Sequence, residues 1–165
     1  MSSELRWVDG DATLADAHAV RRDVFIEGQD ISESLEMDGR DDEAFHVVAY
    51  ATGEDENTPS KETEAQASAG TAVTGYPVAT ARLRIPEPGL AKPERVAVRA
   101  PYRETGIGRQ VMRAIEDRAR EKGCTKAKLH AQVAVEEFYH GLGYETTSDV
   151  FEEAGIPHVE MVKEL

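Results

Sequence analysis

The sequence has a single cysteine, Cys124, in 165 residues, no apolar run long enough to cross a membrane, and no signal-like N-terminus. A lone thiol excludes an internal disulfide framework and a cysteine-based metal site. The missing apolar run and signal argue against a membrane protein and a secreted one. We therefore expect a cytoplasmic protein that uses no metal and does not associate with membranes.

Basic residues are scarce as well. The chain has 19 Lys and Arg, six of them lysine, against 32 Asp and Glu, for a net charge of −13. Because contacts with phosphates need a surplus of cations, this balance argues against nucleic acid as the main partner. The acidic enrichment is similar to that of proteins from salt-loving microbes, in which concentrated salt screens the repulsion between acidic side chains.

The length and the 40% hydrophobic content suit one globular domain over residues 1–165. Residues 53–70 lack apolar periodicity, so we expect a flexible surface loop there, between two strands. Residues 31–43 are polar and acidic, with Leu35 and Met37 as the expected apolar anchors. The sequence leaves the oligomeric state open, including a homodimer.

Hydrophobic periodicity predicts a mixture of helices and strands. Helices are expected from a cap at Asp11 or Thr13 to Gly28, from Ile107 to a C-terminal cap at Gly123, and over 133–142. Strands are expected at 5–8, 45–51, 78–85, 95–99 and 126–132, with two more in the tail 144–165. In the strand 78–85, the face with Arg82 and Arg84 could meet a substrate carboxylate.

A glycine turn joins an apolar strand to a helix at residues 103–108, which read Arg-Glu-Thr-Gly-Ile-Gly. The glycines let the backbone approach a ligand closely, and the first free N–H groups of the helix point at an anion bound there. The surrounding segment 92–128 has 11 Lys and Arg against 5 Asp and Glu, whereas the rest of the chain has 8 against 27. A solvated arginine-rich helix face would show the same bias. Together with the turn, the bias predicts a nucleotide-cofactor site. The dinucleotide fingerprint fails, because Val111 stands where its third glycine is needed.

Two blocks of the sequence resemble those of the GNAT acyl-CoA N-acyltransferases. The family pattern Gln/Arg-x-x-Gly-x-Gly/Ala, which follows an apolar strand, is matched by Arg103, Gly106 and Gly108. The second family block consists of an Asn-like residue, a Phe-Tyr pair and the sequence Leu-Gly-Phe/Tyr. This chain has these parts at Gln132, 138–139 and 142–144. Further segments look like the ElaA-like branch in particular: Val24-Phe25 with Gln29, 35–41, 79–84, 129–132 and 153–158.

The resemblance implies an α/β (α+β) fold with a mixed, mostly antiparallel central sheet of six or seven strands, splayed near its middle and flanked by about four helices. It implies acetyl-CoA as the acyl donor and direct transfer of the acetyl group to a primary amine of a small molecule or peptide, without a metal. Arg99, Arg109 and Arg113 could neutralise phosphates. The residues that it places along the cofactor are Val96, Ala97, Val98, Arg103, Glu104, Thr105, Gly106, Ile107, Gly108, Arg109, Gln132 and Phe138.

The resemblance also places a general acid at Tyr139. A phenol can protonate a leaving thiolate without being charged at neutral pH. The alternative is that Phe138 and Tyr139 only pack a short helix on the sheet. For the base that must deprotonate the amine, the sequence offers His130, on the polar side of its strand, although a lone strand histidine is more often structural.

An acidic set could instead bind a cationic amine or supply a carboxylate base, or it could be a solvated acidic surface: Glu27, Asp38, Asp41 and His46. Glu104 departs from the family pattern, in which a glycine commonly follows the arginine. Its carboxylate weakens cofactor binding if it faces the phosphates. Glu104 and the missing unique base support an alternative function, a non-catalytic acyl-CoA-binding sensor module.

Overall fold

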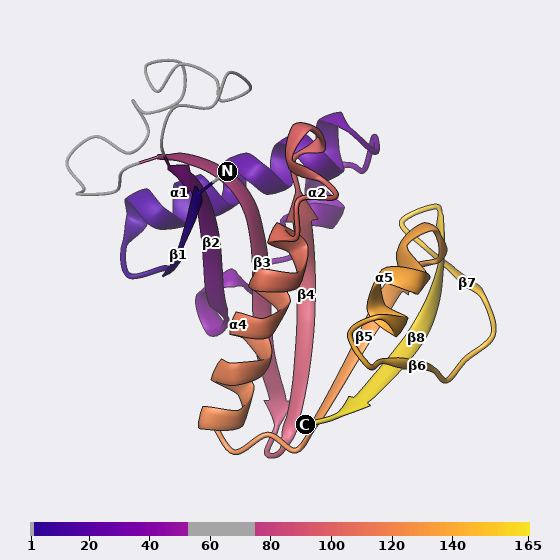
Figure 1. Ribbon diagram of the computed structural model, residues 1–165. Helices are drawn as coiled ribbons and strands as arrows, with labels where there is room; N and C mark the ends of the chain where they lie inside the picture. The colour runs from indigo at the N-terminus through magenta and orange to yellow at the C-terminus, as the bar shows by residue number, and fades with distance from the viewer. Residues whose placement is uncertain (1, 53–74) are drawn as a thin grey trace.

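One open sheet of eight strands runs through the computed structural model, which describes residues 2–52 and 75–165 (Figure 1). The strand order is β1-β2-β3-β4-β5-β8-β6, with β7 beside β8, and all pairs are antiparallel except β4 and β5. The bounds are β1 Ser2–Trp7, β2 Phe45–Thr52, β3 Tyr76–Glu87, β4 Leu90–Val98, β5 Lys126–Gln132, β6 Glu145–Thr146, β7 Phe151–Glu153 and β8 Ile156–Glu164.

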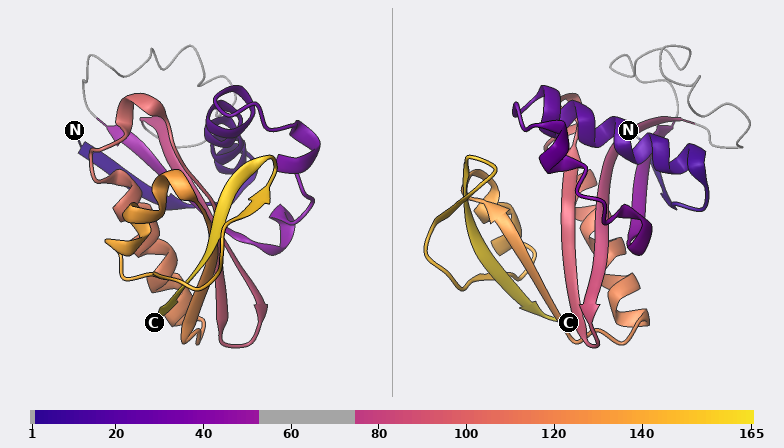
Figure 2. Two further views of the ribbon diagram at one scale, coloured as in Figure 1. Left: turned by 90° about the vertical axis from the view of Figure 1, so that its right-hand side faces the viewer. Right: turned by 180° about the vertical axis from the view of Figure 1, so that it is seen from behind.

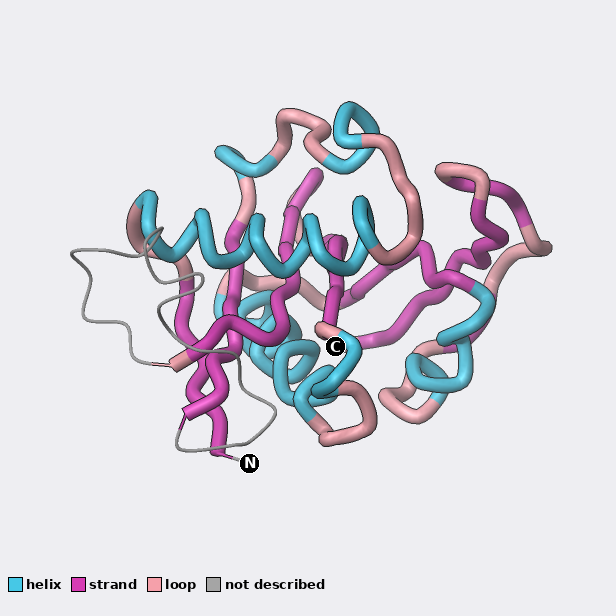
Figure 3. The backbone as a smooth tube through the Cα atoms, turned by 90° about the horizontal axis from the view of Figure 1, so that it is seen from above, coloured by secondary structure: helices cyan, strands magenta, loops and turns pink. Residues whose placement is uncertain are grey.

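The mixed, mostly antiparallel sheet is confirmed, and the C-terminal tail contributes three strands where the sequence predicts two. The expected loop at 53–70 lies outside the described residues. Helices lie on both faces of the sheet, with α4 and α5 on one and α1 and α2 on the other (Figures 2 and 3). Their bounds, with those of the short η turns, are α1 Asp11–Arg21, η1 Arg22–Glu27, α2 Glu33–Glu36, η2 Asp41–Glu43, η4 Ala100–Tyr102, α4 Ile107–Glu121, η5 Val133–Val135 and α5 Glu136–His140.

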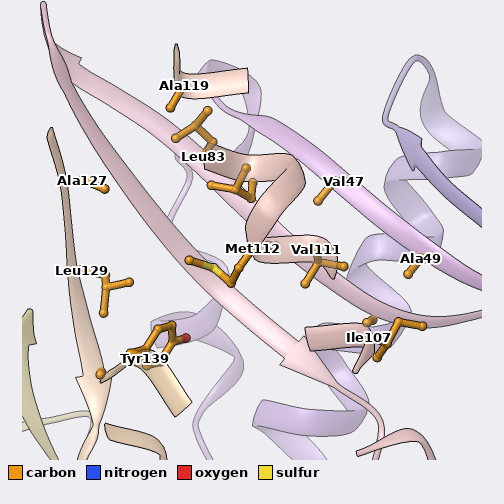
Figure 4. Packing of buried hydrophobic residues seen from close by; sticks show 14 of the residues in the cluster. Val47, Ala49, Leu83, Ile107, Val111, Met112, Ala119, Ala127, Leu129 and Tyr139 are labelled. Carbon is orange, nitrogen blue, oxygen red and sulfur yellow. The ribbon is translucent and has the colours of Figure 1, made fainter. Parts of the chain in front are cut away.

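Helix α4 presents the predicted apolar stripe to the sheet. Each of its five stripe residues is at most 1% exposed, and they pack with residues of β2 and β3 in the main core (Figure 4). The spacing of three and four residues places these side chains on one face, where burial removes them from water. The stripe consists of Ile107, Val111, Met112, Ile115 and Ala119.

Helix α1 differs from its expected start. Gly10 occupies the cap position in extended conformation, and no side chain caps the helix. Thr13 instead donates to the Gly10 carbonyl at 3.1 Å, inside the first turn. The helix then widens into the π-helical turn η1 and ends at Gly28, as predicted. A Cβ at Gly28 would lie 2.7 Å from the Val24 carbonyl oxygen, so only glycine fits there.

The prediction that Leu35 and Met37 are the apolar anchors of residues 31–43 is wrong. Leu35 and Met37 are 57% and 41% exposed, whereas Glu36 between them is buried. Arg21 pairs with the Glu36 carboxylate through Nε and, at 2.9 Å, through Nη2. Buried charges are stable only when they are paired and hydrogen-bonded, so this ion pair fixes α2 in place of an apolar contact.

Candidate functional site

Strands β4 and β5 pair only at their beginnings, where Leu90 faces Lys126 and Ala91 faces Ala127. Beyond these pairs they diverge, as Figure 1 shows. The edges that face each other along 92–98 and 128–132 therefore have no backbone partner across the gap within the described residues. An extended ligand with amide groups can add to such an edge as a further strand.

A β-bulge accompanies the divergence. Thr80 pairs with Ala97 and Arg82 with Glu94, so two residue steps along β3 span three along β4. Arg95, inside the bulge, has a left-handed φ of 53°. An extra residue bends its strand locally and re-aims the side chains next to it. The bulge thus lies in the part of β4 that turns away from β5.

The predicted cradle forms where β4 leads into α4. Gly106, at the cap position, has φ 88°, and no side chain caps the helix. The first turn closes with Gln110 N–H donating to the Gly106 carbonyl at 3.2 Å. The backbone N–H groups of Ile107, Gly108 and Arg109 come before it and have no acceptor in the described part of the chain. Three donors at the positive end of a helix dipole suit an anion.

Three elements meet at Gly108. A Cβ there would lie 3.3 Å from Phe138 Cζ and 3.6 Å from Val98 Cγ2. The start of α4, the end of β4 and α5 therefore converge at this glycine. Two contacts hold the turn before it: Arg103 Nε donates to the Val98 carbonyl at 3.0 Å, and Thr105 Oγ1 donates to the Tyr102 carbonyl at 2.5 Å.

Glu104 has φ 64° in this turn. Left-handed backbone is costly for a residue with a Cβ and free for glycine, which explains why a glycine is common here in the family that the sequence resembles. The Glu104 side chain is exposed.

Of the arginines expected to neutralise phosphate, Arg99 is occupied elsewhere. Its guanidinium is buried, donates to the Pro77 carbonyl at 2.8 Å and lies 3.1 Å from Asp23 Oδ2. It also stacks on the Tyr76 ring. The exposed cations near the cradle are Arg103, Arg109 and Arg113.

Tyr139 lies in the core beneath the gap between the strands. The side chain is 7% exposed, and its ring packs edge-on against Phe138 and Tyr144. Figure 4 shows it beside Leu129 and Met112. Burial raises the pKa of its hydroxyl, and no group in the described residues hydrogen-bonds to that hydroxyl. The phenol is therefore protonated and has its proton free to donate.

His130 lies on the opposite face of β5. Ala127, Leu129 and Ala131 point into the core, so the imidazole projects to the other side, which α4 and α5 do not cover. Its Nδ1 lies 3.0 Å from Glu153 Oε1 on β7. The sequence did not identify Glu153 as a partner of His130. The pair Ala154-Gly155 was the available signal, because a two-residue turn returns the chain and brings position 153 close to the sheet.

Three members of the acidic set, Asp38, Asp41 and His46, do not form an open acceptor site, whereas Glu27 is exposed. Arg82 is buried and contacts Asp38 Oδ2 at 2.9 Å, Asp41 Oδ1 at 3.0 Å and Glu94 Oε1 at 2.9 Å. Arg84 is also bound to Glu94, at 2.6 Å. Both arginines are thus engaged inside the protein, and the expectation that they meet a substrate carboxylate is wrong.

The same contacts make the two aspartates poor bases. Hydrogen bonds from Arg82 lower the pKa of Asp38 well below its usual range, against the effect of burial. Burial alone would raise the pKa of Asp41, but hydrogen bonds from His18, Arg21 and Arg82 outweigh it and lower the pKa strongly. Carboxylates held ionised in this way bind protons weakly.

His46 is not an accessible base either. It is 4% exposed, and its Nε2 donates to the Asp41 carbonyl at 3.0 Å. Burial lowers the pKa of the imidazole. The carboxylates Asp38 and Asp41 and the imidazole of His46 therefore belong to an internal ionic cluster that ties α1, α2 and η2 to β3.

Comparisons with known proteins agree with this geometry. The family model described as an acetyltransferase (GNAT) domain matches residues 75–165, more than half of the chain. Two relatives come from Bacillus subtilis (strain 168). The uncharacterized protein YyaT is 35% identical and aligns with 98% of this chain and 95% of its own length. The uncharacterized N-acetyltransferase YjcF is 32% identical, with 92% of each chain covered.

Solved structures share the fold. A protein of Lactobacillus plantarum, provisionally described as an N-acetyltransferase, superposes with a TM-score of 0.80 at 29% identity over 100% of this chain and 99% of its own. Escherichia coli ElaA superposes with a TM-score of 0.75 at 21% identity over 99% and 100% of the two chains, a likeness of fold alone. No helix among residues 2–52 and 75–165 is both long and apolar enough for a membrane span.

Proposed function

This chain belongs to the GNAT acetyltransferase family, and from that premise we propose that it transfers an acetyl group from acetyl-CoA to a primary amine of a small molecule or peptide. The observation that carries the proposal is the continuity of two unpaired backbone surfaces. The free edge of β4 ends beside the uncapped N-terminus of α4, to which η4 and the turn at 103–106 connect it. An extended amide arm followed by a diphosphate needs this combination of donors.

Acetyl-CoA would bind here as the acyl-donor substrate. The backbone of Val96, Ala97 and Val98 faces the gap and is suited to pair with the pantetheine arm. The absent Cβ at Gly108 leaves the α4 amides open to phosphate oxygens, beside Phe138. Residues proposed to surround the diphosphate are Arg103, Glu104, Thr105, Gly106, Ile107, Gly108 and Arg109, with Gln132 at the open end of β5.

In the proposed reaction, the amine attacks the thioester carbonyl directly. A carbon–nitrogen bond forms, the carbon–sulfur bond breaks, and the amine loses one proton. His130 is our candidate to accept that proton, and Tyr139 is our candidate to protonate the leaving thiolate. The proton balance closes when His130 releases its proton to solvent and Tyr139 recovers one. No metal takes part in this scheme.

A second function is favoured by Glu104. Its carboxylate belongs to the turn that would face the diphosphate, and repulsion between them would weaken the binding of an anionic substrate. The sequence also offers no unique base for the amine. An acyl-CoA-binding sensor module would keep the cradle and lack turnover.

Calorimetry with acetyl-CoA, together with release of free thiol across a panel of primary amines, tests both functions. Gly108→Val, which fills the cradle, should abolish binding. Gly10→Ala is the matched control, because a Cβ there would meet nothing within 4 Å. Binding with thiol release supports the enzyme, and binding without release on any amine supports the sensor. If the wild-type protein does not bind acetyl-CoA, both are excluded.

A further inference from the structure

The exposed imidazole on β5 is held by a carboxylate from a distant strand. The His130 ring contacts Glu153 through Nδ1 at 3.0 Å and meets the edge of Phe151, with 5.1 Å between ring centroids. We propose that Glu153 is a positioning residue that fixes the tautomer and orientation of His130, so that the imidazole Nε2 faces the acceptor amine as the base. This inference rests on the proposed acetyl transfer and adds to it Glu153, the group that orients His130 to act as a base.

A tight hairpin brings Glu153 to this position. Ala154 has φ 53° and Gly155 has φ 76°, and the pair connects β7 to β8 with Glu153 facing Ile156. Two successive left-handed residues make the two-residue turn that suits twisted antiparallel strands. Phe151 and Glu153 are two residues apart on β7, so both project to the face that carries His130. The sequence therefore encodes the contact through the turn.

The carboxylate determines which nitrogen of His130 carries the proton. An ionised carboxylate only accepts hydrogen bonds, so the Nδ1 beside it must be the donor. In the neutral ring Nε2 then has a free lone pair. No group within the described residues hydrogen-bonds to His130 Nε2. The amine proton can therefore move to Nε2, and the resulting imidazolium is stabilised by Glu153.

His130 is also correctly placed along the sheet. Continuing the parallel register from Ala91 and Ala127 by three residues sets His130 level with Glu94, next to the bulge residue Arg95. At this level the two strands have already separated. An imidazole on the face free of α4 and α5 therefore lies beside the gap that would hold the thioester.

Several charged groups surround the imidazole. Glu160 on β8 lies directly opposite His130, and its carboxylate accepts from Thr147 at 3.1 Å. His158 on β8 donates from Nδ1 to the Ile156 carbonyl at 2.7 Å, and its Nε2 lies 3.7 Å from Glu153 Oε2. Lys128 shares the β5 face. Two carboxylates, Lys128 and His158 thus face the imidazole, and Glu153 is the one whose carboxylate contacts its Nδ1.

The test compares Glu153→Gln with Glu152→Gln, an adjacent exposed glutamate whose side chain projects from the other face of β7. Nitrogen-15 NMR of the histidine rings reports the His130 tautomer without any need for turnover. The pH dependence of kcat/KM for an amine that wild-type accepts reports the base. For Glu153→Gln we expect loss of the Nδ1–H tautomer, a kcat at least about tenfold lower, and an acid limb moved to lower pH. Acetyl-CoA binding and Glu152→Gln should match wild-type.

A double variant separates positioning from a general structural effect. Because Glu153 acts through His130, Glu153→Gln should add nothing to the loss caused by His130→Ala. An additive loss, an unmoved acid limb or an unchanged tautomer would overturn the proposal. If wild-type binds acetyl-CoA but acetylates no amine, the proposed enzyme function fails and with it the role of Glu153 in catalysis, while the tautomer still reports whether Glu153 orients the ring.

Discussion

The side-chain amides of Gln29 and Gln132 exchange two hydrogen bonds, of 3.0 and 2.9 Å, across 103 positions of the chain. Gln29 follows η1, and Gln132 ends β5 at the open side of the diverging strands. Among the described residues, this pair is the only side-chain hydrogen bond between the first 52 residues and the segment that starts at β5. The amide pair therefore connects the helical layer over β4 with the separated half of the sheet.

We expect the two amides to be energetically coupled. Gln29→Ala and Gln132→Ala should each lower the free energy of unfolding by about 1 kcal/mol, because each leaves the partner amide without its hydrogen bonds. The double variant should lose little more than either single one. Urea unfolding of all four proteins measures this coupling. Strictly additive losses would show that the two amides do not depend on each other.

Two substitutions of Glu104 separate the effect of its charge from the effect of its left-handed backbone. Glu104→Gly should tighten acetyl-CoA binding and stabilise the fold by up to about 1 kcal/mol, since it removes both a carboxylate and the strain of a left-handed φ. Glu104→Gln removes only the charge. It should tighten binding about threefold or more at low salt, without the gain in stability. Calorimetry and thermal unfolding separate the two effects. Unchanged affinity in both variants would show that the carboxylate faces away from the ligand.

The ionic cluster predicts how stability depends on pH. The pKa values of Asp38, Asp41 and Glu94 are all lowered in the folded state. A lowered folded pKa adds stability above the unfolded value, about 4, and that stability is lost as the pH falls toward the folded value. The contribution of these groups to the free energy of unfolding should therefore be level above about pH 5 and decline steeply below about pH 4.

Asp38→Asn should make this acid decline shallower and lower stability at pH 7, because Arg82 loses an ionised partner in a buried position. The matched control is Asp117→Asn on the exposed side of α4, whose pairing with Arg120 is solvent-screened. Urea titrations between pH 3 and 8 compare the two variants. Equal slopes would show that the cluster does not determine acid stability.

The sequence predicts the fold well where periodicity and glycine chemistry agree. The stripe of α4, the bounds of β5 and the turn at Gly106 follow from spacing and backbone freedom alone. Helix α2 does not, because Leu35 and Met37 point outward while Glu36 is buried against Arg21. An ion pair that joins two elements has no local signature. For the same reason the sequence could not show that Arg82, Asp38 and Asp41 are bound to one another and closed to substrate.

The candidate site could also be predicted from the sequence only in part. The turn and the two family blocks identify the cradle and nominate Tyr139 and His130, but Glu153 becomes a partner of His130 only through the β7–β8 hairpin. The catalytic and cofactor-binding roles stay predictions, as do the cytoplasmic location and the halophilic origin that the acidic composition suggests. The composition alone says nothing about the amine acceptor, since its pocket is assembled from distant segments.

Tyr139 and Tyr144 offer a matched pair for the last prediction. Both rings are buried and pack edge-on, but the Tyr144 hydroxyl donates to Glu116 at 2.9 Å, whereas no described group bonds to the Tyr139 hydroxyl. Tyr139→Phe keeps the ring and removes the proposed acid, so kcat should fall about 100-fold or more with acetyl-CoA affinity and stability nearly unchanged. Tyr144→Phe should do the reverse, lowering stability by about 1 kcal/mol and sparing kcat, because the buried Glu116 loses one hydrogen-bond donor and keeps Lys163 at 2.8 Å. Because burial raises the pKa of Tyr139, its proton is retained at high pH, and the wild-type rate should show no alkaline limb from this group. Thiol-release kinetics and urea unfolding of both variants decide the matter: equal losses of rate would mean that the Tyr139 hydroxyl acts through packing and that the thiolate takes its proton from elsewhere.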